Sequence, residues 1–245
     1  MFEITVCFLL ILCVAAITKY RGINLDKEIF ISFLRAVLQV MLLSFIILKL
    51  FQLSSFFTFL ALTVMGFAGA LTANKHGKFL KSSLFPTVVS VYISSFSILL
   101  LMLLLHVIEN KASVVLPLGG MVIGNSMNSI SLAFDRLNSE LEHEMHYIET
   151  MLCLGFSTKQ AFEKIERSCI KSAMIPKINN MKALGLVWIP GLMAGMILGG
   201  ANPVKAAIYQ LIIIAMIVVS SFVSSIIVIQ TSKRRIFNKH EQIIC

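Results

Sequence analysis

Seven apolar segments constrain this chain more than any other feature of its sequence. A helix that crosses a bilayer needs about 20 mainly apolar residues, with a range of roughly 17 to 25. With 58% hydrophobic residues and a mean hydropathy of +0.89, the chain is too apolar for a soluble domain. The segments cover residues 2–17, 34–53, 56–73, 84–107, 114–134, 183–198 and 206–229. We therefore predict an all-α, polytopic membrane protein with about seven transmembrane helices in one domain over residues 1–245.

The basic residues predict how these segments are oriented. Lys and Arg accumulate in cytoplasmic loops, and here they cluster after the first, third and fifth segments and in the C-terminal tail. The opposite side carries only Lys49, Lys111 and Lys205. Glu3 is among the leading residues of the first segment and Lys19 follows the segment, which favours an uncleaved helix over a signal peptide. We expect a protein of the cytoplasmic membrane with its N-terminus outside and its C-terminus cytoplasmic.

The net charge of +9 also reflects the basic residues of the loops, since the positive charges lie between the apolar segments. It therefore indicates orientation and not nucleic-acid binding. The five cysteines form no C-x-x-C pair, and most of them would lie in lipid or cytosol, so we expect no disulfide.

The interval 135–182 is the only long polar stretch, and we expect it to form a cytoplasmic helix-bend-helix. Four apolar residues share one helical stripe at spacings of four, three and four: Leu141, Met145, Ile148 and Leu152. Gly155 should end this helix. Ser157 and Gln160 have the form of a capping box that starts a second helix, which we expect to stop at Pro176.

Polar residues inside the apolar segments are candidates for a substrate path or gate. Arg35 and Gln39, four apart at the start of the second segment, either snorkel to the membrane surface, line a substrate route or hold the helix bundle together. In the fifth segment, Gly124, Asn125 and Asn128 lie close together on one helical face. Amides in lipid must bond to another helix, to water in a cavity or to a substrate, so helix packing and substrate contact both remain open.

The sixth segment combines a helix breaker with small residues. Pro190 followed by Gly191 predicts a kink or break. Three glycines recur at intervals of four: Gly191, Gly195 and Gly199. Such a ridge allows close approach of another helix, for instance from a second copy of the chain. Met193 and Met196 are either packing residues or soft metal ligands.

Several kinds of chemistry are missing from the sequence. No G-x-x-x-x-G-K-[ST] phosphate loop occurs, so ATP and Mg²⁺ would have to be bound by a partner subunit. His143 and His146 are three apart, whereas H-E-x-x-H zinc sites need four, so we expect a solvated helix face and no metal site. An intramembrane hydrolase would need a base near Ser126, and only the peripheral His106 is a candidate. We expect no catalytic residues and no cofactor in this chain.

The bend resembles the cytoplasmic EAA loop of ABC-transporter permeases in the spacing Glu149-x5-Gly155-x9-Ile165. The resemblance implies that the bend sits in a groove of an ATPase subunit. Gly155 would permit close backbone approach, and Phe156 or Leu152 would be an apolar anchor. The expected coupling residues are Glu149, Met151, Leu152, Gly155, Phe156, Ser157 and Ile165.

Five motifs, in order along nearly the whole chain, resemble the FetB/YbbM family of small permease subunits. They are RAVLQ at 35–39, GMVIGNSM at 120–127, the glycine-rich stretch 185–200, PVKA at 203–206 and YQ at 209–210. Plant aluminium-tolerance half-transporters belong to the same group.

The resemblance implies a homodimeric permease that works with an ABC ATPase. It also implies a small solute or metal ion as substrate, with bacterial members assigned to iron export and metal homeostasis and plant members linked to nucleotide-sugar transport. A membrane sensor or scaffold that holds a cytosolic partner without transport is the alternative.

Overall fold

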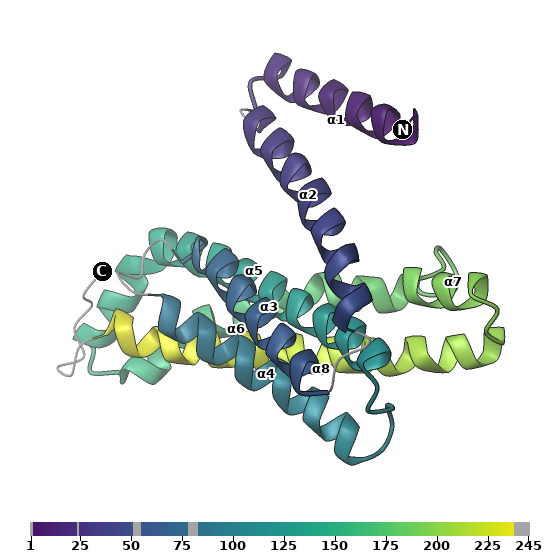
Figure 1. The fold of residues 1–245 in the computed structure, drawn as a ribbon. Helices are drawn as coiled ribbons and strands as arrows, with labels where there is room; N and C mark the ends of the chain where they lie inside the picture. Colours follow the sequence, from purple (N-terminus) through teal and green to yellow (C-terminus); the bar gives the residue numbers. More distant parts are fainter. Residues whose placement is uncertain (1, 24, 51–54, 78–82, 238–245) are drawn as a thin grey trace. The chain divides into compact units, whose positions relative to one another are not determined.

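Helices make up the regular structure of the computed structural model, which describes residues 2–23, 25–50, 55–77 and 83–237 (Figure 1). In these residues the chain forms no strand, and its one isolated bridge joins Leu184 and Trp188. The helices are α1 (Phe2–Tyr20), α2 (Asp26–Leu50), α3 (Ser55–Asn74), α4 (Leu84–Leu104), α5 (Ala112–Cys153), α6 (Thr158–Ala183), α7 (Gly191–Leu198) and α8 (Pro203–Ile236). The predicted all-α fold is confirmed.

Length and composition identify the helices that are able to cross a bilayer. Within the described residues, four are long and apolar enough: Asp26–Ile47, Phe56–Asn74, Leu84–Leu104 and Pro203–Ile236. α1 adds a shorter apolar stretch, Thr5–Tyr20. The chain is therefore a multi-pass membrane protein, whereas the predicted number of seven spanning helices is not confirmed.

The chain forms two compact units, residues 1–54 and 55–245. In the first, α1 and α2 pack against each other, and the Phe8 ring lies 5.5 Å from that of Phe30. α2 begins at Asp26 and not at residue 34 as predicted. Acidic residues in the first turn suit the positive end of the helix dipole, which explains the earlier start. The predicted end of this segment, residue 53, lies outside the described residues.

The second unit is a bundle built around α5 and α8. α5 packs against α3, α4, α6 and α8, while α8 packs against α4, α5, α6 and α7. Large side chains with almost no exposed surface fill the centre: Ile130, Phe134, Leu137, Ile213, Met216 and Ile229. Glycines bring the helices close, since a Cβ at Gly119 of α5 would lie 2.7 Å from the Leu62 side chain of α3.

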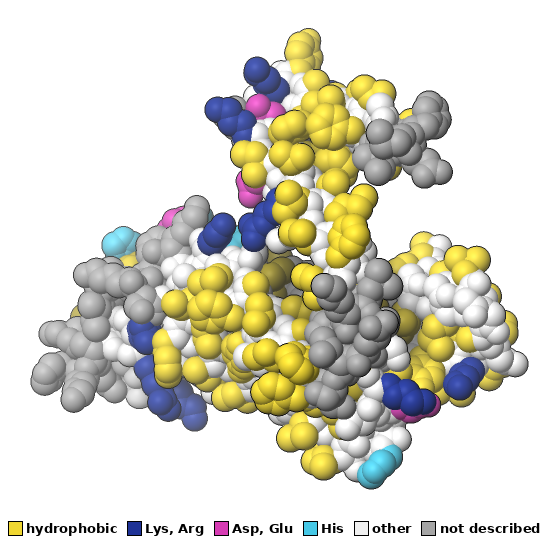
Figure 2. All heavy atoms as spheres, viewed as in Figure 1, with side chains coloured by type: hydrophobic (Ala, Val, Ile, Leu, Met, Phe, Trp, Pro, Cys, Tyr) yellow, Lys and Arg dark blue, Asp and Glu magenta, His cyan; other side chains and the backbone are white. Residues whose placement is uncertain are grey.

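The outer surface of the second unit is apolar over much of its visible face, and Lys and Arg side chains gather at its ends (Figure 2). Exposed large hydrophobic residues include Phe85, Leu100, Leu211 and Phe222. A soluble protein rarely exposes so much contiguous apolar surface, whereas a bilayer covers it. The surface therefore agrees with a membrane-embedded bundle.

α5 is a continuous helix of 42 residues. At a rise of 1.5 Å per residue it is about 63 Å long, roughly twice the thickness of a bilayer's hydrocarbon core. The predicted span 114–134 is only its first half. The second half enters the polar interval without a break, so its end at Cys153 stands about 30 Å beyond residue 134.

One sequence prediction about the segments after the bend is wrong. Pro176 does not stop the second helix, because α6 continues to Ala183. A helical proline forfeits only one backbone hydrogen bond, and the buried Ala173 and Lys177 hold the turns on both sides in place.

The predicted segment 183–198 is not one continuous helix, and the break predicted at Pro190 is confirmed. Residues 184–190 are irregular, and α7 contains eight residues, about 12 Å of helix. Pro190 is the N-cap of α7, and it interrupts the helix because it lacks an N–H group and keeps the residue before it out of the helical conformation.

Candidate functional site

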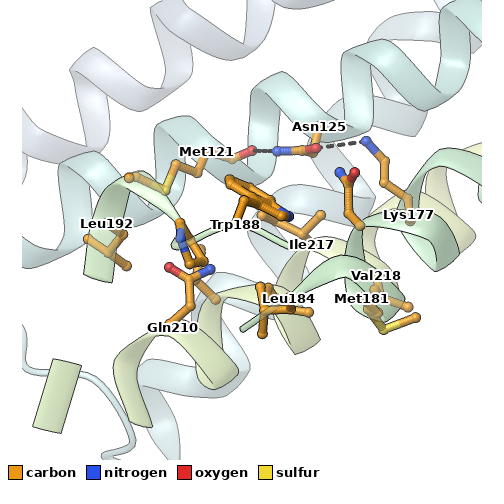
Figure 3. Close-up of a pocket in the computed structure, with 15 residues that line it drawn as sticks. Met121, Asn125, Lys177, Met181, Leu184, Trp188, Leu192, Gln210, Ile217 and Val218 are labelled. Carbon is orange, nitrogen blue, oxygen red and sulfur yellow. Dashed lines mark hydrogen bonds between the residues drawn. The ribbon is translucent and has the colours of Figure 1, made fainter. Parts of the chain in front are cut away.

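A cavity of about 330 Å³ lies where the chain is broken between α6 and α7. α5, α6, the irregular residues, α7 and α8 all line it (Figure 3). Its walls are mainly apolar, with a few polar groups that converge on the space: Asn125, Lys177, Asn180 and Gln210. A concave apolar site with a few placed polar groups is typical of small-ligand binding.

Lys177 and Asn125 form the polar wall of this cavity. The Lys177 ammonium donates to the Asn125 Oδ1 atom at 2.7 Å, and the Asn125 amide donates to the Met121 carbonyl at 2.8 Å (Figure 3). Only 6% of Lys177 is exposed. Asn125 is 11 residues inside the predicted span 114–134, about 16 Å from its outer end, so the ammonium lies near the middle of that span.

Gln210 and Trp188 complete the site. Gln210 of α8 is 7% exposed, and its buried Oε1 atom has no hydrogen-bond partner in the described residues. Trp188, from the irregular stretch, extends its indole across the cavity between the Asn125 and Gln210 sides (Figure 3). The site therefore offers an ammonium, an amide oxygen in need of a donor, and an aromatic face.

The break in the helix has a physical consequence in a membrane. Backbone that is not helical cannot face lipid, and at membrane depth it is tolerated only where protein buries it or where it lines a cavity. Within residues 184–190, Leu184, Trp188 and Pro190 meet this condition at the cavity, whereas Leu186, Val187 and Ile189 are exposed. Discontinuous helices of this kind form substrate sites in many transporters.

The structure brings some predicted path residues together and separates others. Asn125, Pro190 and Gly191 line the cavity, and Met196 lines a second cavity with Ser113, Lys205 and Tyr209. Gly124 is half-buried one position before Asn125, whereas Asn128 is exposed. Arg35 and Gln39 belong to the first unit, where they lie well inside α2 and not at its start, with exposed side chains.

The glycine ridge of α7 faces outward. Gly191, Gly195 and Gly199 are exposed, and a Cβ added at the first two would meet no atom within 4 Å. Met193 is half-buried. The ridge is therefore not used for packing within the described residues, and it remains free for another helix.

Sequence reasoning missed Lys177 and Gln210, although a signal for Lys177 was present. Buried residues of α6 recur at intervals of four: Ala161, Ile165, Cys169, Ala173 and Lys177. A lysine in register with an apolar stripe is a buried lysine. Gln210 appeared in the sequence only as part of a family motif, and nothing in its spacing predicted an unpaired amide.

The bend, which we call the elbow (residues 154–157), forms as the sequence predicts. Gly155 has a φ of +83°, and the N–H groups of Gly155 and Phe156 donate to Leu152 and Met151 carbonyls at 3.0 and 3.1 Å. This is a Schellman ending, which favours glycine at the left-handed position. Both bonds of the Ser157–Gln160 capping box are present, so α6 starts where expected.

The predicted coupling residues differ in exposure. Phe156 is 41% exposed, and Leu154, which sequence reasoning did not single out, is 69% exposed. Glu149 is exposed and lies 3.5 Å from His146. Ile165 is fully buried in the core, so its side chain supports the elbow and is not available to a partner.

Two further predicted coupling residues, Met151 and Leu152, are half-buried in the last turn of α5. Two exposed apolar side chains on a rigid turn thus form the outer surface of the elbow.

Behind the elbow, a polar clamp joins α5 to α6. Arg136 and Ser168 both donate to the Glu140 carboxylate, at 2.7 and 2.6 Å, and Arg136 also donates to Ser168 at 2.9 Å. The adjacent Cys169 thiol is buried, and desolvation together with the Glu140 charge raises its pKa to about 12. Nearer the elbow, Lys164 pairs with Glu144 at 2.8 Å. The clamp and this ion pair therefore join α5 to α6 over several turns.

In the described residues, the side chains considered for an intramembrane hydrolase and for a zinc site do not come together. Ser126 is buried where Ser94 and Ser95 donate to its hydroxyl at 3.4 and 3.2 Å, while His106 is exposed beyond the end of α4. His143 and His146 are exposed on α5. No group of three metal-ligating side chains occurs in the part of the chain that the structure describes.

Comparison with known proteins gives consistent matches. Residues 1–237 match the family described as "Uncharacterised protein family (UPF0014)". The UPF0014 membrane protein slr1647 of Synechocystis is 32% identical over 94% of this chain and 90% of its own length. The probable iron export permease protein FetB of Escherichia coli is 27% identical, covering 99% of this chain and 94% of its own.

A plant protein matches as well. Protein ALUMINUM SENSITIVE 3 of Arabidopsis thaliana is 28% identical over 89% of this chain and 81% of its own length. No solved structure matches. The family match over almost the whole chain confirms the relationship predicted from the five motifs, and the chain belongs to the UPF0014 family.

Proposed function

We propose that this chain is the membrane permease subunit of an ABC transporter and that a separate ATPase drives it. One observation carries the proposal: the same two helices, α5 and α6, form both the elbow and the polar wall of the cavity. Because the Glu140 clamp ties them together, a push on the elbow is transmitted along a rigid hairpin to Asn125 and Lys177. Such transmission couples an ATPase to a substrate site.

Other features support this function. The chain has no phosphate loop, so ATP and Mg²⁺ would be bound by the partner. The relative from Escherichia coli carries the name of an iron export permease, which suggests iron export as one form of the activity. We propose that the chain acts in the cytoplasmic membrane, with its elbow on the cytoplasmic side.

Transport subunits of this kind work in pairs because their ATPases do, and we propose a homodimer. The exposed Gly191–Gly195–Gly199 ridge is available to contact the second copy. Alternating closure of two ATPases would then switch the paired cavities between inward-open and outward-open states.

The elbow provides the test. The ATPase that copurifies with the chain is reconstituted with it in vesicles, and ATP turnover is compared for Gly155→Arg and Gly155→Asn. Asparagine tolerates the left-handed backbone, whereas arginine adds both strain and bulk to the surface of the turn. We expect Gly155→Asn to retain coupled turnover and Gly155→Arg to lose it, with the helix content of both variants unchanged.

Two results would overturn the proposal. Normal turnover in Gly155→Arg would exclude a groove that receives the elbow. An ATPase that copurifies but never responds to any solute would indicate a scaffold and not a permease.

A further inference from the structure

The charge of the cavity identifies the class of ligand that fits it. Among the described residues that line it, Lys177 is the only charged side chain, and none carries a carboxylate or an imidazole. Among the ion pairs of the described residues none includes Lys177. A buried ammonium with one neutral amide as partner is costly in a membrane, and an anion would offset that cost.

A second group in the cavity also lacks its partner. The Gln210 Oε1 atom is buried and accepts no hydrogen bond from the described residues. An unsatisfied buried acceptor costs about 1–3 kcal/mol, which a ligand O–H or N–H group would recover. Gln210 and Lys177 come from different helices, α8 and α6, so one ligand that reached both would bridge the two sides of the cavity (Figure 3).

We propose that this cavity binds a small hydroxy acid, with a carboxylate on the Lys177 ammonium and a hydroxyl donating to Gln210. Trp188, Met121 and Leu184 enclose the apolar part of the ligand. A volume of about 330 Å³ is at the small end of ligand cavities, which suits a compact acid. This identification of the substrate class rests on the proposed permease function.

The site disfavours a bare metal cation. Hard cations such as iron need carboxylate oxygens or imidazoles, and an ammonium repels them. If a metal crosses here, it enters as an anionic complex whose acid ligands shield it. The iron named for one relative and the cation-repelling cavity are then compatible.

A second cavity extends the positive character toward the predicted outer side. It has a volume of about 250 Å³ and is lined by Lys205, Tyr209 and Ser113, while Leu192 lines both cavities. An anion that leaves Lys177 past Leu192 would therefore next meet Lys205. α7, which carries Leu192, is the element between the two sites.

Binding to the purified full chain tests the proposal without any ATPase. Titration calorimetry is carried out with citrate, with its ferric complex, with Fe²⁺ alone, and with tricarballylate, which is citrate without the hydroxyl. We expect citrate or its ferric complex to bind and Fe²⁺ alone not to bind. Comparison of the citrate titration with the ferric citrate titration distinguishes a free acid from a metal complex as the ligand.

Two variants assign the contacts. Lys177→Met should weaken citrate binding about 10- to 100-fold, the value of a charge-assisted hydrogen bond, while Lys177→Arg retains it. The matched control is Lys182→Met, which removes an exposed lysine from the same helix. Gln210→Leu should abolish the preference of the wild-type chain for citrate over tricarballylate, which we expect to be about fivefold.

The outcomes separate this inference from the proposed function. Binding of Fe²⁺ alone, equal binding by Lys177→Met and wild type, or no binding of either acid form would each overturn the hydroxy-acid site, even if the ATPase responded normally to the elbow. Citrate binding that depends on Lys177, in a chain whose elbow variants never change ATP turnover, would support the site and reject the permease.

Discussion

The elbow and the cavity lie at opposite ends of the same helical hairpin, and they differ in how they are built. The elbow consists of four consecutive residues. Their backbone hydrogen bonds are made with neighbours in the sequence, between Met151 and Gln160. The cavity gathers side chains from positions 121 to 218, and some of its polar groups are left with unfilled bonding capacity. The elbow is therefore stable by itself, whereas the cavity has a buried acceptor that the proposed ligand would satisfy.

The difference indicates that stability and function compete at the cavity and not at the elbow. A fully satisfied turn gains nothing structurally from a partner, so its exposed Leu154 and Phe156 are available for recognition. The buried lysine and glutamine reduce the stability of the chain without ligand, and such a cost agrees with the proposed binding site. Four measurements would break or sharpen this comparison.

The largest expected effect concerns cysteine labelling around the hairpin. In a background with Cys7, Cys13 and Cys245 replaced by serine, an impermeant maleimide should label exposed Cys153 from the cytoplasmic side only. Cys169 should not react at pH 8, because a pKa of about 12 leaves roughly one thiol in 10⁴ ionised. Labelling of Cys153 from outside intact cells would place the elbow on the wrong side of the membrane for an ATPase.

The next effect compares two phenylalanines six residues apart. Phe162 is fully buried and contacts Phe237 edge to face, so Phe162→Ala should lower the free energy of unfolding by about 3–5 kcal/mol. Phe156→Ala should leave thermal stability within about 0.5 kcal/mol of wild type but reduce coupled ATP turnover. Equal destabilisation by both would mean that the elbow is part of the core.

Lys177→Met should change stability and binding in opposite directions. Without ligand, removal of a buried charge should raise the free energy of unfolding by about 0.5–2 kcal/mol, although Asn125 loses one partner. Thermal unfolding with and without citrate measures both effects. A strongly destabilised variant would show that Lys177 is structural, which contradicts the proposed ligand site.

The smallest effect concerns the cap of α6. Ser157→Ala removes the acceptor for the Gln160 N–H group and should cost about 1 kcal/mol. Ser157→Asp, which keeps a capping oxygen, is the matched control. Hydrogen exchange should report faster opening of the first turn of α6 in the alanine variant and no change near the cavity. Faster exchange at residues 184–190 would mean that the two regions are not energetically separate.

Much of the fold follows from local patterns along the chain. The elbow was predictable to the residue, because a glycine at a left-handed position and a Ser-x-x-Gln box act only on neighbours. Asn125, Pro190 and Gly191 were singled out for similar reasons, as polar or helix-breaking residues within apolar segments. The continuation of α6 through Pro176 was not predictable, because packing outweighed a local preference for a helix end.

The site itself depends on distances that no local pattern encodes. Lys177 appeared to belong to a cytoplasmic loop, and only the packing of α6 against α5 places its ammonium 2.7 Å from Asn125. Likewise, Gln210 looked like one polar residue in a long apolar helix until α8 was seen to line the same cavity. By itself, the sequence determined an all-α membrane protein with a capped elbow, since hydropathy and capping act over a few residues. The tertiary structure alone decided which polar groups meet at the broken helix, because that depends on contacts between helices far apart in the chain.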